Sequence, residues 1–111
     1  MCSAGVDTVI YTTTAQYRHA IKLFVMVEGI EDGGGPNWET QACDIIAVRG
    51  YNNNTVSITA YGLIHSGANP LATFDGQWNP TSNRVEITCR PTSASYGVEV
   101  KVHAIEMNSN D

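Results

Sequence analysis

The 111-residue sequence lacks several features that would assign a structural or functional class at once. No window of ten residues shows the helical spacing of apolar side chains, which argues against helical bundles and α/β folds. The longest apolar run, Leu23 to Val27, is far shorter than the about 20 residues that span a bilayer. The N-terminus also lacks the charged and apolar segments of a signal peptide. We therefore expect a soluble, unprocessed chain without a membrane partner.

Basic residues are scarce. Six Lys and Arg stand against eleven Asp and Glu, which gives a net charge of −5. A protein that binds nucleic acid needs clustered cations to displace counterions from the phosphates, so we expect no nucleic-acid partner. The length suits one domain with an ordinary core. We predict a single domain over residues 1–111, with flexible ends at residues 1–6 and 108–111.

The three cysteines form no CxxC pair, and their odd number does not describe a disulfide framework. A reducing compartment fits this pattern best. Cys43 and Cys89 each lie within a strand pattern, so we interpret them as small buried hydrophobic residues, with a Cys43–Cys89 bridge as the alternative. Cys2 has no neighbouring base or cation that would lower its pKa.

Short stretches rich in Val, Ile, Thr and Tyr, separated by turn residues, dominate the sequence. The predicted strands are Asp7 to Thr14, Arg18 to Glu28, Trp38 to Arg49, Thr55 to His65, Leu71 to Trp78, Arg84 to Arg90 and Gly97 to Met107. The predicted loops and turns are Ile30 to Asn37, Gly50 to Asn54, Gly67 to Pro70 and Asn79 to Asn83. Regularly spaced short strands predict an all-β fold, an antiparallel β-sandwich or jelly roll of about seven to eight strands.

Two of the predicted strands are apolar on both faces, although a sheet with one solvated side should carry polar residues there. Phe24 and Met26 stand on the second face of one strand, and Ile46 and Val48 on that of the next. Either the other sheet with a local loop or a neighbouring subunit covers this face. We therefore take these four residues as candidate interface residues and expect a homo-oligomer.

No constellation of residues points to catalysis, a metal or a cofactor. His19, His65 and His103 lack the spacing that would bring two of them to one metal ion. Asp75 and Glu86 could face each other across a hairpin, but any two strands offer such a pair. An enzyme would need a cleft that gathers His65, Asp75 and a second carboxylate. We predict no enzymatic activity and no cofactor.

Aromatic side chains offer a different kind of site. Trp38 and Tyr51 could form a stacking platform for a sugar ring. The competing interpretation, for Trp78 and Tyr61 above all, is that the aromatic residues lie in the core or on the sheet surface.

Several segments, taken in order, resemble a small β-domain found in virion structural proteins of tailed bacteriophages, especially marine ones. The segments are Thr12 to Ala20 with the strand that follows, Ala60 to Leu63, Pro70 to Asp75, Arg84 to Thr92 and Val98 to His103. The resemblance covers roughly residues 8 to 105. The Gly33 to Pro36 loop and the strand opening at Trp38 depart from it, because they are longer and more aromatic than usual.

The resemblance implies a protein of the phage particle, assembled in the host cytoplasm, with no catalytic residues. A small acidic β-domain suits a capsid decoration or cement protein at the head surface, bound to the major capsid protein. A tail, collar or fibre component with a glycan-binding role is the alternative. Its partners would then be tail proteins.

Overall fold

A computed structural model describes residues 5–14, 19–31, 38–49, 55–66, 70–92 and 95–108. These residues form seven β-strands in two antiparallel sheets, which confirms the predicted all-β sandwich. The strands are β1 (Thr8–Thr12), β2 (His19–Glu31), β3 (Trp38–Arg49), β4 (Ser57–His65), β5 (Ala72–Asn79), β6 (Arg84–Pro91) and β7 (Ser95–Asn108). None of the described residues belongs to a helix that would span a membrane.

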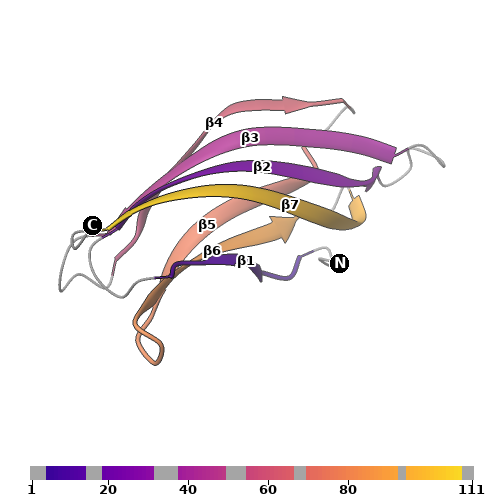
Figure 1. Ribbon diagram of the computed structural model, residues 1–111. Helices are drawn as coiled ribbons and strands as arrows, with labels where there is room; N and C mark the ends of the chain where they lie inside the picture. Colours follow the sequence, from indigo (N-terminus) through magenta and orange to yellow (C-terminus); the bar gives the residue numbers. More distant parts are fainter. Residues whose placement is uncertain are drawn as a thin grey trace.

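The two sheets have the strand orders β4-β3-β2-β7 and β1-β6-β5. Figure 1 shows the four-stranded sheet lying over the three-stranded sheet, with β1 on the same side as β7 and β5 towards β4. β3 and β4, which follow each other along the chain, are adjacent and antiparallel. The first strand, β1, is an edge strand, and it pairs with β6 far along the chain.

The core fills the space between the sheets because alternate residues of each strand point inwards. In β2 the inward set is Ile21, Leu23, Val25 and Val27, all of them buried. Val85, Ile87 and Cys89 of β6 face them from the other sheet and are also buried. Cys43 is buried as well, and both cysteines are free thiols, as the favoured interpretation predicted. Cys2 lies outside the described residues.

One buried polar side chain ties the two sheets together. Gln41 of β3 is almost completely buried, and its Nε2 donates to the carbonyl of Ala72 at 3.0 Å. Its Oε1 accepts from the backbone N–H groups of Leu71 and Ala72, at 2.5 and 3.1 Å. These bonds satisfy the backbone where the chain enters β5, so Gln41 acts as a clamp between β3 and the three-stranded sheet.

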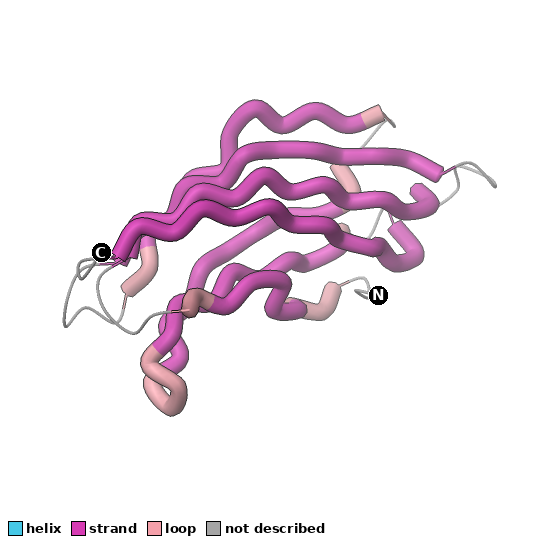
Figure 2. Tube along the Cα trace, viewed as in Figure 1, coloured by secondary structure: helices cyan, strands magenta, loops and turns pink. Residues whose placement is uncertain are grey.

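The turn between β5 and β6 follows the turn prediction (Figure 2). The Asn79 side chain accepts from the N–H groups of Thr81 and Ser82, and Asn83 N–H donates to the Asn79 carbonyl at 2.8 Å. Asn83 has a φ of 56°, which asparagine adopts more readily than most residues.

The predicted and observed strands differ in detail. β2 continues to Glu31, beyond the predicted end at Glu28, because Ile30 pairs with Trp38 and extends the ladder. Asp75 and Glu86 do not face each other, because the β5–β6 register places Asp75 opposite Thr88 and Gln77 opposite Glu86. The predicted loops at residues 32–37, 50–54 and 67–69 lie outside the described residues.

Candidate interaction surface

The outward face of the four-stranded sheet, here called the apolar face, gathers the four candidate interface residues. The even-numbered residues of β2 and β3 point outwards, because their odd-numbered neighbours fill the core. Phe24, Ile46 and Val48 are exposed at 53, 43 and 47%, and Met26 is half-buried. The structure thus places all four on one surface.

The outer strands extend this surface with exposed apolar residues that were not among the four candidate interface residues. Ile105 and Met107 of β7 are exposed at 57 and 70%, and they pair across the sheet with Lys22 and Ala20 of β2. On the other side, Tyr61 and Ile64 of β4 are exposed. The signal was present at the end of β7, where two apolar residues interrupt an otherwise polar face.

Two shallow, adjoining grooves hollow the apolar face. One, of about 230 Å³, is lined by Ala20, Ile21, Lys22, Ile46, Ile105 and Met107. The other, of about 330 Å³, lies between β3 and β4 and is lined by Ile46, Val48, Ser57, Ile58 and Thr59. Ile46 lines both grooves, and each groove could take a protruding apolar side chain of a partner.

Charge on the apolar face is mixed in sign: Glu28, Glu99 and Lys101 lie towards its Trp38 end, and Lys22 and Asp44 lie among apolar side chains. Lys22 is directly opposite Ile46, and Asp44 is directly opposite Phe24, so the two charged side chains occupy one diagonal of a square and the two apolar side chains the other. No ion pair joins Lys22 or Asp44 to another residue in the described part of the chain. Neither charge is therefore neutralised by a close partner there.

The outward face of the three-stranded sheet, here called the polar face, has the opposite character. Gln77 Nε2 donates to Glu86 at 2.7 Å, and Asn79 Nδ2 donates to the same carboxylate at 3.2 Å. Arg90 donates to the Gly5 carbonyl at 2.9 and 3.1 Å. Polar groups on this face bond to one another and to the backbone.

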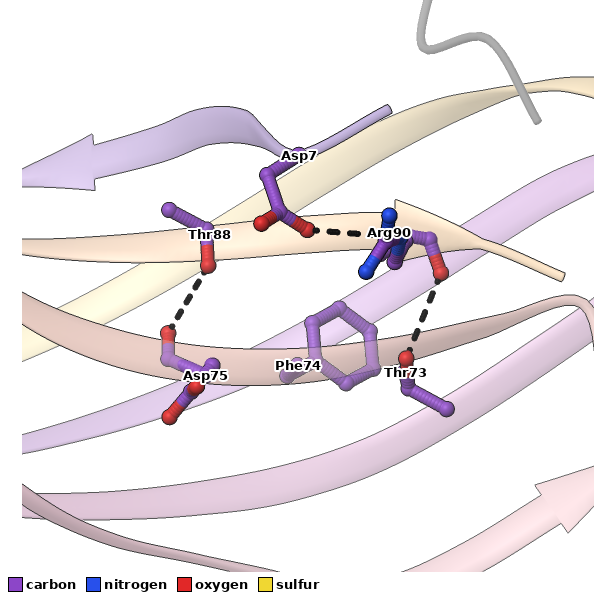
Figure 3. Close-up of a pocket in the computed structure, with 6 residues that line it drawn as sticks. All are labelled: Asp7, Thr73, Phe74, Asp75, Thr88 and Arg90. Carbon is purple, nitrogen blue, oxygen red and sulfur yellow. Dashed lines mark hydrogen bonds and ion pairs between the residues drawn. The ribbon is translucent and has the colours of Figure 1, made fainter. Parts of the chain in front are cut away.

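A small pocket of about 180 Å³ opens on the polar face (Figure 3) and is lined by Asp7, Thr73, Phe74, Asp75, Thr88 and Arg90. Arg90 Nε lies 3.8 Å from Asp7 Oδ1, and both side chains are more than half exposed. Thr73 and Thr88 donate to backbone carbonyls of the neighbouring strands at 3.4 and 3.3 Å. The polar side chains here are thus occupied largely with holding β5 against β6.

The residues proposed for sugar stacking fall into two groups. Trp38 opens β3 and is 54% exposed, so its ring is open to a ligand. Tyr51 lies outside the described residues. Trp78 is half-buried under the Arg49 guanidinium, whose carbon lies 3.4 Å from the ring centroid, and this matches the core interpretation. Tyr61 lies on the apolar face, which matches the sheet-surface interpretation.

The side chains considered for catalysis are not brought together. His65 lies in β4 and Asp75 in β5, which belong to different sheets. His103 lies in β7, opposite Phe24 on the apolar face, and the side chain of His19 lies outside the described set. Across the described residues, no three His, Cys, Asp or Glu side chains gather in a way that could hold a metal ion. Burial, and then the nearby Asp44, raise the pKa of the Cys43 thiol and keep it protonated.

A carboxylate links the two sheets at the edge where β1 lies beneath β7. The Tyr11 hydroxyl donates to Glu106, and the Thr14 N–H donates to both oxygens of that carboxylate at 3.1 Å. Burial raises the pKa of the Tyr11 hydroxyl, and the hydrogen bond to Glu106 and its negative charge raise it further. The tyrosine therefore keeps its proton in the folded state.

Comparison with known proteins adds no family to these observations. No protein-family model, curated protein or solved structure matches the chain.

Proposed function

We propose that this chain is a structural protein of a phage particle that decorates and cements the head surface, and that it has no enzymatic activity. The observation that carries the proposal is the apolar face, because a contiguous exposed patch of this kind usually marks a protein contact. The resemblance to virion β-domains supports the assignment of the chain to a phage particle. The partner is another virion protein, either a capsid subunit or a second copy of this chain.

The physical demands of cementing suit this domain. A cement protein needs a rigid body that presents a large surface to its neighbours, and a sandwich holds its outward side chains on a hydrogen-bonded sheet. β2 pairs along its length with both β3 and β7, so Phe24 and Met26 stand on a strand supported from both sides. Such a surface changes little in backbone geometry when a partner binds.

A tail, collar or fibre component that binds a glycan is the second candidate. The exposed Trp38 ring favours it, since aromatic faces stack on sugar rings. The two candidates differ in the effect of Trp38→Ala. This substitution should abolish attachment to the host surface if the chain binds a glycan, and it should leave attachment unchanged if the chain is a decoration protein.

The test of the proposed function is to image purified particles and count the copies of this chain. Hundreds of copies at capsomer positions would support the decoration role, and a few tens or fewer on the tail would support the second candidate. A particle without the chain would contradict both.

A further inference from the structure

We infer that a second copy of this chain covers the apolar face, and that the two copies pack face to face about a two-fold axis with Lys22 of each copy opposite Asp44 of the other. The inference deepens the proposed function, since it rests on the role of this face as a protein contact and names the partner. It is tested independently of the particle.

The argument begins with the square of residues at the centre of the apolar face. Lys22 pairs with Ile46, and Phe24 pairs with Asp44, in neighbouring rungs of the β2–β3 ladder. Consider a two-fold axis that lies in the plane of the interface, along the line from Ile46 to Phe24. Rotation about this axis brings Lys22 of one copy to a position opposite Asp44 of the other. Lys22 then faces Asp44 of the second copy, and Asp44 faces its Lys22.

The same axis places the apolar side chains favourably. Ile46 and Phe24 lie on the axis, so each meets its own counterpart, as a two-fold interface requires. The strands of the two copies cross instead of running parallel, which is one of the two established ways in which sheets pack. The grooves beside Ile46 give the partner's apolar side chains room to interdigitate.

The electrostatics favour a copy of this chain as the partner. Within the described residues no ion pair neutralises Lys22 or Asp44, and both lie amid apolar side chains. A wholly apolar partner would desolvate both charges without compensation, which is costly. A second copy supplies an opposite charge to each of them.

The size of the face is consistent with a reversible dimer. Four strands about 4.8 Å apart, over seven residues at about 3.4 Å each, give roughly 450 Å² of plane per copy. The two copies together approach the about 1,000 Å² at which specific interfaces begin, once side-chain relief is added. We therefore expect dimerisation that depends on protein concentration.

Charge reversal tests the inference through sedimentation at several concentrations. Lys22→Asp sets two carboxylates against each other at every Lys22–Asp44 contact, and Asp44→Lys sets two ammonium groups against each other there. Each variant alone should therefore self-associate about a hundredfold more weakly than the unmodified chain. An equimolar mixture of the two variants should form a heterodimer, because one facing pair then joins two substituted positions of opposite charge and the other joins the unmodified Asp44 and Lys22. The double variant should dimerise like the unmodified chain.

Matched controls keep the outcome interpretable. Val9→Asp places a charge on an exposed apolar residue of the other sheet and should leave dimerisation unchanged. Phe24→Asp meets its own copy on the axis and should abolish dimerisation, which provides a second variant if Asp44→Lys does not fold. Thermal unfolding of each variant establishes that the fold persists.

Several results would overturn the inference: an unmodified chain that stays monomeric at the highest concentration, single variants that dimerise normally, or a mixture of folded variants that remains monomeric. A monomeric chain that is nevertheless present on particles would overturn the dimer and support the proposed function, with a capsid subunit on the apolar face. A charge-dependent dimer that is missing from particles would support the inference and contradict the proposed function.

Discussion

The outward side of the four-stranded sheet carries Phe24, Ile46 and Met107, whereas the outward side of the three-stranded sheet carries Gln77, Glu86 and Arg90. Both faces arise from the same alternation of residues along a strand. On the polar face, side chains form hydrogen bonds with one another and with the backbone. On the apolar face, exposed hydrocarbon costs about 25 cal/mol for each Å² left in water. The polar face can therefore stay in solvent. Covering the apolar face with a partner, by contrast, lowers the free energy.

The largest effect on stability should distinguish a core position from an apolar-face position of the same strand, β2. Leu23 is fully buried and its neighbour Phe24 is half exposed. Leu23→Ala should lower the free energy of unfolding by about 3 to 5 kcal/mol through lost burial and a cavity, whereas Phe24→Ala should lower it by less than about 1 kcal/mol. Urea unfolding of the two variants measures both values. Equal losses would mean that Phe24 belongs to the core and that the apolar face is not a free surface.

A somewhat smaller effect should come from the polar clamp between the sheets. Gln41→Ala removes the Oε1 atom that accepts from the N–H groups of Leu71 and Ala72, which should cost about 2 to 4 kcal/mol in the free energy of unfolding. Thr40→Ala, at the preceding and exposed position of β3, is the control and should cost less than about 0.5 kcal/mol. A small loss for Gln41→Ala would mean that this clamp contributes little to holding the two sheets together.

A third effect concerns the link between β1 of the polar sheet and β7 of the apolar sheet. Tyr11→Phe removes the hydrogen bond to Glu106 and should cost about 1 kcal/mol near pH 7. Since the pKa of Tyr11 is raised on folding, the folded state holds its proton above about pH 10 while the unfolded state releases its own. The free energy of unfolding therefore falls as the pH rises through this range, and it should fall less steeply in the Tyr11→Phe variant.

Urea unfolding at pH 7, 10 and 11 measures this difference. Tyr61→Phe, on the apolar face, is the matched control and should retain the steep alkaline loss. The raised pKa of Cys43 also lowers stability as the pH rises, but it does so in the unmodified chain and in both variants alike. The comparison therefore isolates the contribution of Tyr11. Parallel pH profiles for Tyr11→Phe and the unmodified chain would contradict the assigned role of the hydroxyl.

The smallest effect on stability should come from a charge placed on either outward face, although the two faces should differ clearly in their effect on particle binding. Phe24→Asp and Val9→Asp each place a carboxylate on an outward position, so each should change the free energy of unfolding by about 1 kcal/mol or less. Only Phe24→Asp should prevent binding of the chain to particles stripped of it, measured by co-sedimentation. Loss of binding in Val9→Asp alone would assign the contact to the polar face.

The strands were predictable because each one carries its own alternation. Trp38 to Arg49 has the bounds of β3, and the inward set of β2 follows directly from its period of two. The apolar second face, with Phe24 and Ile46, could be recognised in the same way.

What depends on pairing between distant strands could not be predicted from the sequence. The shift in register between β3 and β4 near Gly62, whose φ is 65°, is set by the two strands together. The role of Gln41 could not be predicted, because the Leu71 N–H that it accepts from lies 30 positions further along the chain. The contact of Tyr11 with Glu106 joins residues 95 positions apart, and no local pattern encodes such a contact.

Hydroxyl-radical footprinting of the assembled particle tests the central claim most directly, because it reports which outward side chains water can reach. We predict that Phe24 and Met107 on the apolar face react more slowly in the particle than in the dilute isolated chain, whereas Val9 on the other sheet reacts at the same rate in both. Protection of Val9 together with unchanged reaction of Phe24 and Met107 would contradict the claim that the apolar face is the contact surface.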